Sequence, residues 1–396
     1  MRRRLSTFLV LLLAVHAALA QNKPRARDLG VPFEGSPGQF NSITDVKGVG
    51  VGHTTLIFGS GPLKVGVGPV RTGVTAILPR GAESDAPAFA AWFALNGTGE
   101  MTGTTFIDEY GLLEGPIMLT NSQSVGTVRD AVGSWLVNQK KWQFCCLPVV
   151  AETYDGDLND INGFHVKAQH VLAALKGASS GAVAEGNVGG GTGMIAFGFK
   201  GGIGTSSRKM EAKQGGYTVG VLVQANMGRR SQLRIAGVPV GLEITEDMPV
   251  AKVEAAERDT GSIIIVIATD APLLPHQLKR LARRAALGLA RTGSIAGDSS
   301  GDIFIAFSTA NPGLVGLQKG DTSTITQVTM LPNDQMNPLF EATVQATEEA
   351  IINALVAAET MTGADDHKAF AIPHDRLRAV LKKYNRLVEP HQKSRP

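Results

Sequence analysis

A pair of serines directly before a strongly apolar run constrains this chain more than any other feature. Ser299 and Ser300 lie in the run Gly-Asp-Ser-Ser-Gly-Asp, and the apolar residues 303–307 follow at once. Such a run is typical of a buried strand. Gly and Asp beside a serine are ordinary turn chemistry, but the same turn can hold a nucleophile that is made by cutting the chain in front of it. Local composition favours the plain turn, so the choice depends on the rest of the chain.

Short apolar runs punctuated by glycine alternate with amphipathic helical patterns along the sequence. The expected strands span residues 43–46, 49–53, 73–78, 196–198, 217–224 and 263–269. Apolar residues at helical spacing predict further elements as helices. The expected helices lie near residues 124–138, 165–176, 275–291, 339–358 and 374–384, whereas residues 88–95 fit a strand or a helix. No internal repeat or linker interrupts the pattern, so we expect one α+β domain with helices packed outside sheets.

The first twenty residues have the pattern of a secretory signal peptide. Three arginines precede a short apolar core, and Ala18-Leu19-Ala20 matches a cleavage site. The apolar core is too short to cross a bilayer, and no later run reaches the roughly 18 residues that a spanning helix needs. We therefore expect residues 1–20 to be removed and the protein to be exported, either periplasmic or secreted. An uncleaved anchor is the alternative.

The balance of charge argues against nucleic acid as a partner. The whole chain has 38 basic and 35 acidic residues. Residues 1–20 contain three arginines and no acid, so the remainder carries 35 of each sign. A protein without excess positive charge binds the phosphate backbone poorly. After signal removal we expect neither nucleic acid nor a membrane as a partner.

Cysteine, histidine and glycine patterns predict no metal and no cofactor. Cys145 and Cys146 are adjacent in an apolar run expected to be a strand, where a mutual disulfide would be strained, so buried thiols are favoured. The eight histidines show no metal-ligand spacing. The glycine-rich run 186–193 lacks the Lys-Ser/Thr ending of a phosphate-binding loop. It favours a tight loop where the backbone approaches another element.

Ser300 has no evident histidine partner. His276 and His374 could fold back toward it, but no spacing indicates that they do. A serine can act without histidine when it is the first residue of a chain. Its own α-amine, with a pKa of roughly 7.7–8.0, then serves as the general base. Self-cleavage creates such a residue when the hydroxyl attacks the preceding carbonyl carbon.

The sequence resembles the exported β-peptidyl aminopeptidases, within the self-processing serine aminopeptidases that include the L-aminopeptidase/D-amino-acid esterase–amidases. The resemblance covers nearly all of residues 21–396, and the combination of its blocks is specific although each block alone is weak. The blocks are residues 25–30, 41–53, 96–103, 152–155, 185–208, 221–226, 268–288, 300–309, 346–351 and 360–363.

The resemblance implies a self-cleaved enzyme. The chain would be cut between Ser299 and Ser300, which leaves Ser300 as the N-terminal nucleophile. A single catalytic domain would then consist of a larger chain, residues 21–299, and a smaller chain, residues 300–396, that stay together. The implied fold is a four-layer α/β/β/α sandwich, and the implied assembly is a homotetramer.

Further residues gain roles from the same resemblance. Asn226 matches an asparagine that donates to the developing oxyanion, and Tyr154 matches a tyrosine that could donate to the same oxyanion. Glu152 matches the acid that binds the ammonium of the substrate. Glu349 is our choice for the acid that orients the new N-terminal amine, with the adjacent Glu348 as the alternative.

The expected function is the release of N-terminal amino acids, β-amino acids among them, from short peptides, amides or esters through an acyl-enzyme. An L-aminopeptidase/D-amino-acid esterase–amidase is the alternative within the resemblance. An acyltransferase of related fold matches less well, because those enzymes use threonine and work in the cytoplasm. A non-catalytic exported binding protein is the alternative of another class, and it would stay in one piece on a denaturing gel.

Overall fold

The structure is a computed structural model that describes residues 23–389, apart from residues 83, 85, 140–146, 250–260 and 315–324. The predicted signal peptide at residues 1–20 lies outside the described residues. The same holds for the cysteine pair, Cys145 and Cys146, and for most of the strand expected around it.

The smaller sheet has four strands in the order β1-β2-β5-β6. They are β1 (Gly50–Phe58), β2 (Val70–Leu78), β5 (Ile117–Asn121) and β6 (Val149–Thr153). β5 and β6 run parallel, and the other pairs are antiparallel. Every residue of β2, β5 and β6 is buried, so this sheet is covered on both faces.

The larger sheet has six strands in the order β4-β3-β12-β11-β10-β9. They are β3 (Ala88–Gly97), β4 (Leu112–Leu113), β9 (Gly202–Lys209), β10 (Thr218–Asn226), β11 (Ser262–Thr269) and β12 (Gly301–Ser308). β11 and β12 are parallel, and Ser262 pairs in register with Asn226 on one side and with Gly301 on the other. The end of β10 therefore lies beside the starts of β11 and β12, at one end of the strands of this sheet.

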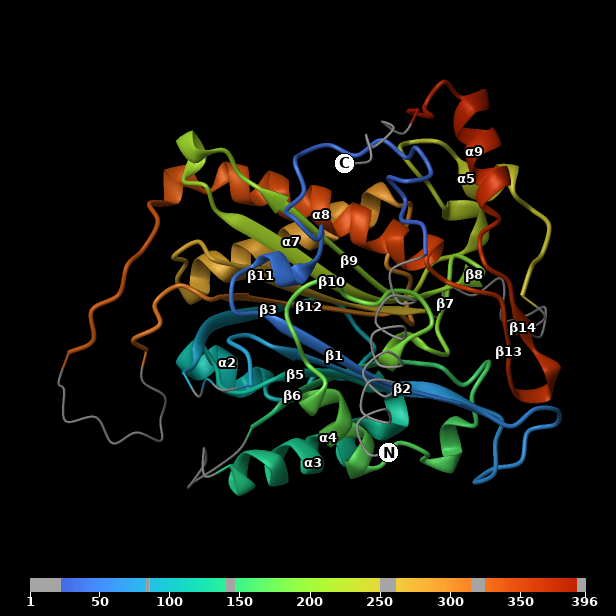
Figure 1. The fold of residues 1–396 in the computed structure, drawn as a ribbon, viewed down its shortest axis with the longest axis horizontal. Coiled ribbons are helices and arrows are strands. Elements are labelled where there is room, and N and C mark those ends of the chain that lie inside the picture. The colour runs from blue at the N-terminus through green and yellow to red at the C-terminus, as the bar shows by residue number, and fades with distance from the viewer. Residues whose placement is uncertain are drawn as a thin grey trace, which may run out of the picture.

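Helices cover the outer faces of both sheets. α7 (Pro275–Arg291) and α8 (Asn337–Val356) pack on the larger sheet, and α3 (Val125–Asn138) and α4 (Ala168–Lys176) pack on the smaller one (Figure 1). A third apolar cluster fills the space between the sheets. Side chains of β11 alternate between the two neighbouring layers: Ile264 and Val266 point into the inter-sheet core, while Ile265 points toward the helices.

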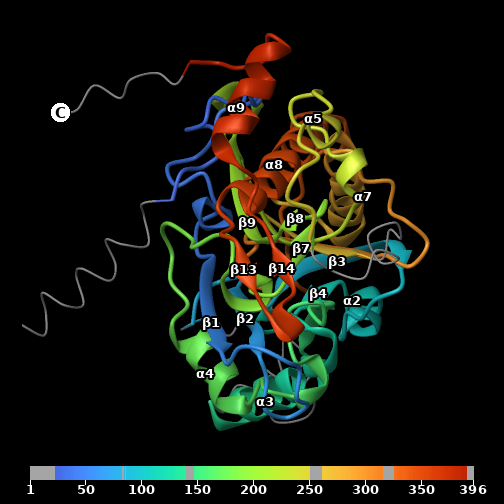
Figure 2. The same ribbon diagram turned by 90° about the vertical axis from the view of Figure 1, so that its right-hand side faces the viewer.

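Smaller elements surround these layers. They are the helices α2 (Thr104–Tyr110), α5 (Val240–Glu243) and α9 (His374–Lys383), with the hairpins β7 (Ile195–Ala196)–β8 (Phe199–Lys200) and β13 (Met361–Thr362)–β14 (Lys368–Ala369). Figure 2 shows the β13–β14 hairpin along one end of the sheets, with α9 beyond it. The 3₁₀ turns are Ile43–Asp45, Ser122–Ser124, Ile161–Gly163, Gly189–Gly191, Ala212–Gln214, Arg230–Gln232, Asn333–Gln335 and Ala364–Asp366. Within the described ranges, no helix is long and apolar enough to cross a membrane.

The predicted helices and the strands of the larger sheet are confirmed with small shifts at their ends, and residues 88–95 belong to a strand. The strand predicted at residues 43–46 is wrong, and the one predicted around residues 196–198 is divided into the two short strands β7 and β8. Residues 43–46 hold a 3₁₀ turn, because the carboxylate of Asp45 accepts the backbone N–H groups of Phe40 and Ser42 and so favours a local turn. Residues 196–198 turn the β7–β8 hairpin, since Phe197 has a left-handed backbone with a φ of 51°.

Candidate active site

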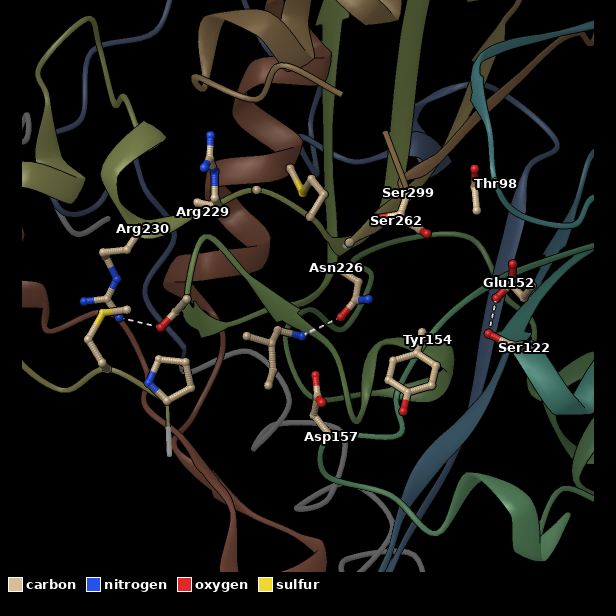
Figure 3. Close-up of a pocket in the computed structure, with 17 residues that line it drawn as sticks. Thr98, Ser122, Glu152, Tyr154, Asp157, Asn226, Arg229, Arg230, Ser262 and Ser299 are labelled. Carbon is tan, nitrogen blue, oxygen red and sulfur yellow. Dashed lines mark hydrogen bonds between the residues drawn. The ribbon is translucent and has the colours of Figure 1, made fainter. Parts of the chain in front are cut away.

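A cavity of about 480 Å³ opens at the end of the larger sheet where β10 ends and β11 and β12 begin (Figure 3). Three of the residues that the sequence singled out line it: Glu152, Tyr154 and Asn226. Gly261 and Ser262, which the sequence reasoning passed over, line it as well. The cavity thus brings together residues from the smaller sheet, β10 and β11.

Asn226 is the last residue of β10 and the cross-strand partner of Ser262. Its Oδ1 accepts the backbone N–H of Ile195 at 2.8 Å. Because the oxygen is held by this bond, the Nδ2 side of the amide is the one turned into the cavity (Figure 3). An amide donor that is fixed in advance is what stabilises an oxyanion without reorganisation.

Glu152 lies near the end of β6, and its carboxylate is buried. One oxygen accepts the backbone N–H of Glu100 at 3.0 Å, and the other accepts the hydroxyl of Ser122. Burial raises the pKa of Glu152, and the two hydrogen bonds oppose that rise. Since a carboxylate offers about four acceptor sites, this group can still receive a substrate ammonium.

Gly99 lies between Glu152 and the start of β12 and contacts both. An ideal Cβ on Gly99 would lie 3.3 Å from Oε1 of Glu152 and 3.1 Å from the Cα of Gly301. Gly301 is in turn the register partner of Ser262. The acid and the strand edge that carries Ser262 and Asn226 therefore border the same small space.

Tyr154 forms part of the cavity wall, but its hydroxyl points away from Asn226 and Ser262 (Figure 3). It lies instead beside Gly156, where an ideal Cβ would come within 2.3 Å of the phenolic oxygen. Burial raises the pKa of Tyr154, and the carboxylates of Asp157 and Asp155 raise it further. In this geometry the phenol does not share an oxyanion with Asn226.

Ser300 lies beside the cavity but does not line it, although Ser299 does. Its side chain is almost fully buried, with 1% of its surface exposed, and its hydroxyl donates to Asp302 at 2.8 Å. Along β12, Ile303 points into the inter-sheet core and Phe304 toward the helices. By this alternation Asp302 faces the helices. The hydroxyl of Ser300 is thus bound on the face of the sheet opposite to Asn226.

Ser262, and not Ser300, lies on the cavity wall beside Asn226. It is the first residue of β11, it lines the cavity, and it shares the inter-sheet face with Asn226. Its Oγ accepts the backbone N–H of Gly301 at 3.1 Å. A signal for this residue was present in the sequence, because Gly261 and Ser262 also stand directly before a buried strand, the most apolar one in the chain.

Glu349 is not near either serine, which contradicts its expected role beside the Ser300 amine. Its carboxylate accepts two hydrogen bonds of 2.8 Å from Arg27 and one of 2.6 Å from Asn41, and it pairs with Arg208 at 2.8 Å. Burial alone would raise the pKa of Glu349, but the hydrogen bond from Arg27 and the charges of both arginines hold it below its usual value. None of these three partners lines the cavity.

The register of the sheet shows how far this ion-pair cluster lies from the cavity. Arg208 is on the edge strand β9, three strands from β12. It pairs with Val219, which pairs with Thr269, which pairs with Ser308. Ser308 is the last residue of β12, so the cluster lies at the opposite end of the sheet from Ser300. The alternative acid, Glu348, pairs with Arg291 at 3.1 Å instead.

The glycine-rich run packs between the sheets, as its close-approach interpretation predicted. An ideal Cβ on Gly190 would lie 2.1 Å from Oε1 of Gln224, and one on Gly191 would lie 2.4 Å from the backbone nitrogen of Ile203. The three glycines of the turn Gly189–Gly191 do not line the cavity. In the part of the chain that the structure describes, no three His, Cys, Asp or Glu side chains are grouped to hold a metal ion.

Known proteins with related sequences match almost the whole chain. The β-peptidyl aminopeptidases BapA of Sphingosinicella microcystinivorans and Sphingosinicella xenopeptidilytica are 55% and 53% identical to it, and the alignments cover 95% and 96% of this chain and 96% and 95% of those proteins.

Solved structures agree with these sequence matches. A β-aminopeptidase from a Burkholderia species superposes with a TM-score of 0.84 at 50% identity and covers 91% of this chain and 99% of its own. The L-aminopeptidase D-Ala-esterase/amidase of Ochrobactrum anthropi, described as a variant of the Ntn (N-terminal nucleophile) hydrolase fold, has a TM-score of 0.85 at 48% identity and covers 92% and 100%.

The model of peptidase family S58 matches residues 41–369, a range that contains the described cavity, Asn226, Glu152 and both candidate serines. The chain therefore belongs to peptidase family S58, and it is a serine aminopeptidase with the Ntn hydrolase fold.

Proposed function

We propose that this protein releases N-terminal β-amino acids from short peptides and amides through an acyl-enzyme formed on Ser262. The observation that carries the proposal is the cross-strand pair of Asn226 and Ser262 on the wall of a cavity that also holds Glu152. The names of the two BapA relatives, at 55% and 53% identity, support the β-peptidyl class of substrate.

Each side chain has a distinct part in the proposed reaction. Glu152 binds the free ammonium of the substrate, which restricts cleavage to the first residue. The hydroxyl of Ser262 attacks the carbonyl carbon of that residue, and the developing oxyanion accepts a hydrogen bond from Nδ2–H of Asn226. The C–N bond then breaks, and the departing amine takes the proton that the base removed from the Ser262 hydroxyl during the attack. Water attacks the resulting ester and releases the amino acid.

The base in this proposal is the α-amine of Ser262 after the chain has been cut in front of it. A serine at the start of a chain carries its own base within reach of its hydroxyl, with a pKa of roughly 7.7–8.0. The absence of a histidine near Ser262 among the residues that line the cavity agrees with this chemistry. The proposed cleavage therefore lies between Gly261 and Ser262.

The choice of Ser262 replaces the cut between Ser299 and Ser300 that the sequence suggested. Ser262 faces Asn226, whereas the hydroxyl of Ser300 is bound to Asp302 on the other side of the sheet. The processed enzyme would be a four-layer α/β/β/α sandwich made of two chains that stay together. Export after removal of residues 1–20 and assembly into a homotetramer are further parts of the proposal, supported by the signal pattern and by the family resemblance.

The cut site decides between the two serines. The C-terminal fragment of the purified protein is sequenced from its N-terminus, and its mass is measured. We expect it to begin at Ser262. Ser262→Ala should give an uncut and inactive chain, whereas Ser300→Ala should still be cut. A fragment that begins at Ser300 would return the nucleophile to that residue, and an active enzyme that stays uncut would refute the N-terminal-nucleophile mechanism.

The L-aminopeptidase/D-amino-acid esterase–amidase alternative is supported by the 48% identity to the Ochrobactrum anthropi enzyme. A comparison of kcat/KM for a β-alanyl amide, an L-alanyl amide and a D-alanyl ester separates the two activities. We expect the β-alanyl amide to be preferred, and a higher kcat/KM for the D-alanyl ester would favour the alternative.

A further inference from the structure

Lys200 is a fully buried lysine close behind the cavity, at the end of β8. Its ammonium donates to three backbone carbonyl oxygens, those of Met194 at 2.7 Å, Gly201 at 2.9 Å and Gly191 at 3.3 Å. These acceptors match the three N–H donors of a charged lysine. Lysine is almost never fully buried unless its charge is compensated, so this arrangement calls for a reason.

One peptide unit links Lys200 to the oxyanion donor. The carbonyl oxygen of Met194 accepts a hydrogen bond from the ammonium of Lys200, and the N–H of the same peptide group belongs to Ile195. That N–H donates to Oδ1 of Asn226 at 2.8 Å. The chain of hydrogen bonds thus runs from the ammonium through the Met194–Ile195 peptide to the Asn226 amide.

Two physical effects follow from this chain. A positive charge on the carbonyl side of a peptide draws electrons from its nitrogen and makes its N–H a stronger donor, and hydrogen bonds in series polarise one another. The Asn226 amide is polarised in the same direction. The chain also fixes which way the amide points, because a flipped amide would present its oxygen to an oxyanion and its NH₂ to the N–H of Ile195.

The three carbonyl contacts of Lys200, and not the electrostatics around it, indicate the charged form. Burial lowers the pKa of Lys200 well below its usual value, and the charge of Lys23 lowers it further, whereas the carboxylate of Asp155 raises it. A neutral amine would turn a lone pair toward one of three carbonyl oxygens, so the observed contacts fit the charged form.

We propose that Lys200 is a positioning residue that orients and polarises the amide of Asn226 through the Met194–Ile195 peptide. The inference rests on the proposed role of Asn226 at the oxyanion. Lys200 does not touch the substrate, and its effect is on the chemical step. Its loss should lower kcat and leave KM nearly unchanged.

A double-mutant cycle tests the coupling. Lys200→Met, Asn226→Ala and the double variant are compared for hydrolysis of β-alanyl p-nitroanilide. We expect Asn226→Ala to lower kcat by about 10²–10³-fold and Lys200→Met to lower it by about tenfold. The double variant should be no slower than Asn226→Ala alone, because Lys200 acts only through that amide. Where a variant is isolated uncut, the same cycle is measured on the rate of chain cleavage.

The outcomes separate this inference from the proposed function. An unchanged kcat in Asn226→Ala would overturn the oxyanion assignment and the inference with it. A large loss in Asn226→Ala, with a Lys200→Met effect that is absent or multiplies with it, would overturn only the role of Lys200. A merely structural lysine would give the multiplied effect.

Folding is controlled with two further variants. Lys200→Gln keeps a neutral donor, should retain a kcat between those of the native protein and Lys200→Met, and carries the cycle if Lys200→Met does not fold. Lys23→Met removes the neighbouring half-buried lysine, which pairs with Glu359, and should leave kcat and KM unchanged. A loss in Lys23→Met equal to that in Lys200→Met would also contradict the proposal, since it would show that the effect does not depend on the hydrogen bonds of Lys200.

Discussion

Glu152 carries its charge where burial opposes it, and two hydrogen bonds hold it there. Its pKa is raised, so the carboxylate becomes protonated at a higher pH than an exposed glutamate does. A protonated Glu152 no longer attracts the substrate ammonium. We therefore expect KM to rise as the pH falls through this raised pKa, while substrate binding is complete above it.

Glu152→Gln tests this pH dependence. The variant keeps the shape of the side chain but loses the charge, so KM should rise at neutral pH and the acid limb of the kcat/KM profile that belongs to Glu152 should vanish. The measurement is the pH profile of kcat/KM for a β-alanyl amide. If the glutamine variant keeps both the native KM and the native acid limb, Glu152 does not bind the ammonium.

At the site, the sequence predicts two of the residues on the cavity wall but not which serine lies beside them. Asn226 and Glu152 were found by resemblance, and the fold brings both to the cavity. The serine was harder, because two serines stand before buried strands and a linear pattern does not tell which face of a sheet a side chain will occupy. The pairing of Ser262 with Asn226 depends on strand register. That register is set by contacts between residues far apart in the sequence.

At the scale of elements, strong periodicity made the helices predictable and non-local pairing hid the sheet. Residues 275–291 form α7 with the expected ends, since their apolar positions repeat at helical spacing over seventeen residues. The neighbours of β12 could not be read in this way. β3 lies beside it although some 200 residues separate them, and no local propensity encodes such a contact.

The Glu349 cluster ties α8 to the N-terminal segment and to β9, and this makes it a determinant of stability. Glu349→Ala leaves Arg208 buried without its partner, so the free energy of unfolding should fall by roughly 3–5 kcal/mol. Because the pKa of Glu349 is lowered in the fold, its contribution is complete above the unfolded pKa and is lost as the pH falls through the folded one. Chemical denaturation at two pH values measures both effects.

Glu348→Gln is the matched control, one residue away on the same helix. Glu348 pairs with the half-exposed Arg291, so its loss should change the free energy of unfolding by about 1 kcal/mol or less. The Glu349→Ala protein that remains folded should keep its kcat, in contrast to the role first expected from the sequence. A loss of kcat in the folded variant without loss of stability would restore that role.

At the scale of the whole molecule, the proposed cut leaves every ladder of the larger sheet in place. β10 and β11 pair through eight residues across the cut, and β12 pairs with β3 along its length. The two fragments should therefore migrate as one species in gel filtration and separate only in denaturant. Gel filtration of the cut protein with and without guanidinium checks this. Separation without denaturant would contradict the proposed single domain of two chains.

The strand order has a consequence for the life history of the protein. β11 and β12 stand in the middle of the sheet, between β3 and β10, so the C-terminal fragment is a wedge with an N-terminal strand on each side. The C-terminal fragment cannot add to an N-terminal fragment that has already folded, because β3 and β10 are held apart only by β11 and β12. The intact chain would thus have to fold before the bond in front of Ser262 is cut. Once that bond is broken, fragments that have been unfolded would not readily refold together.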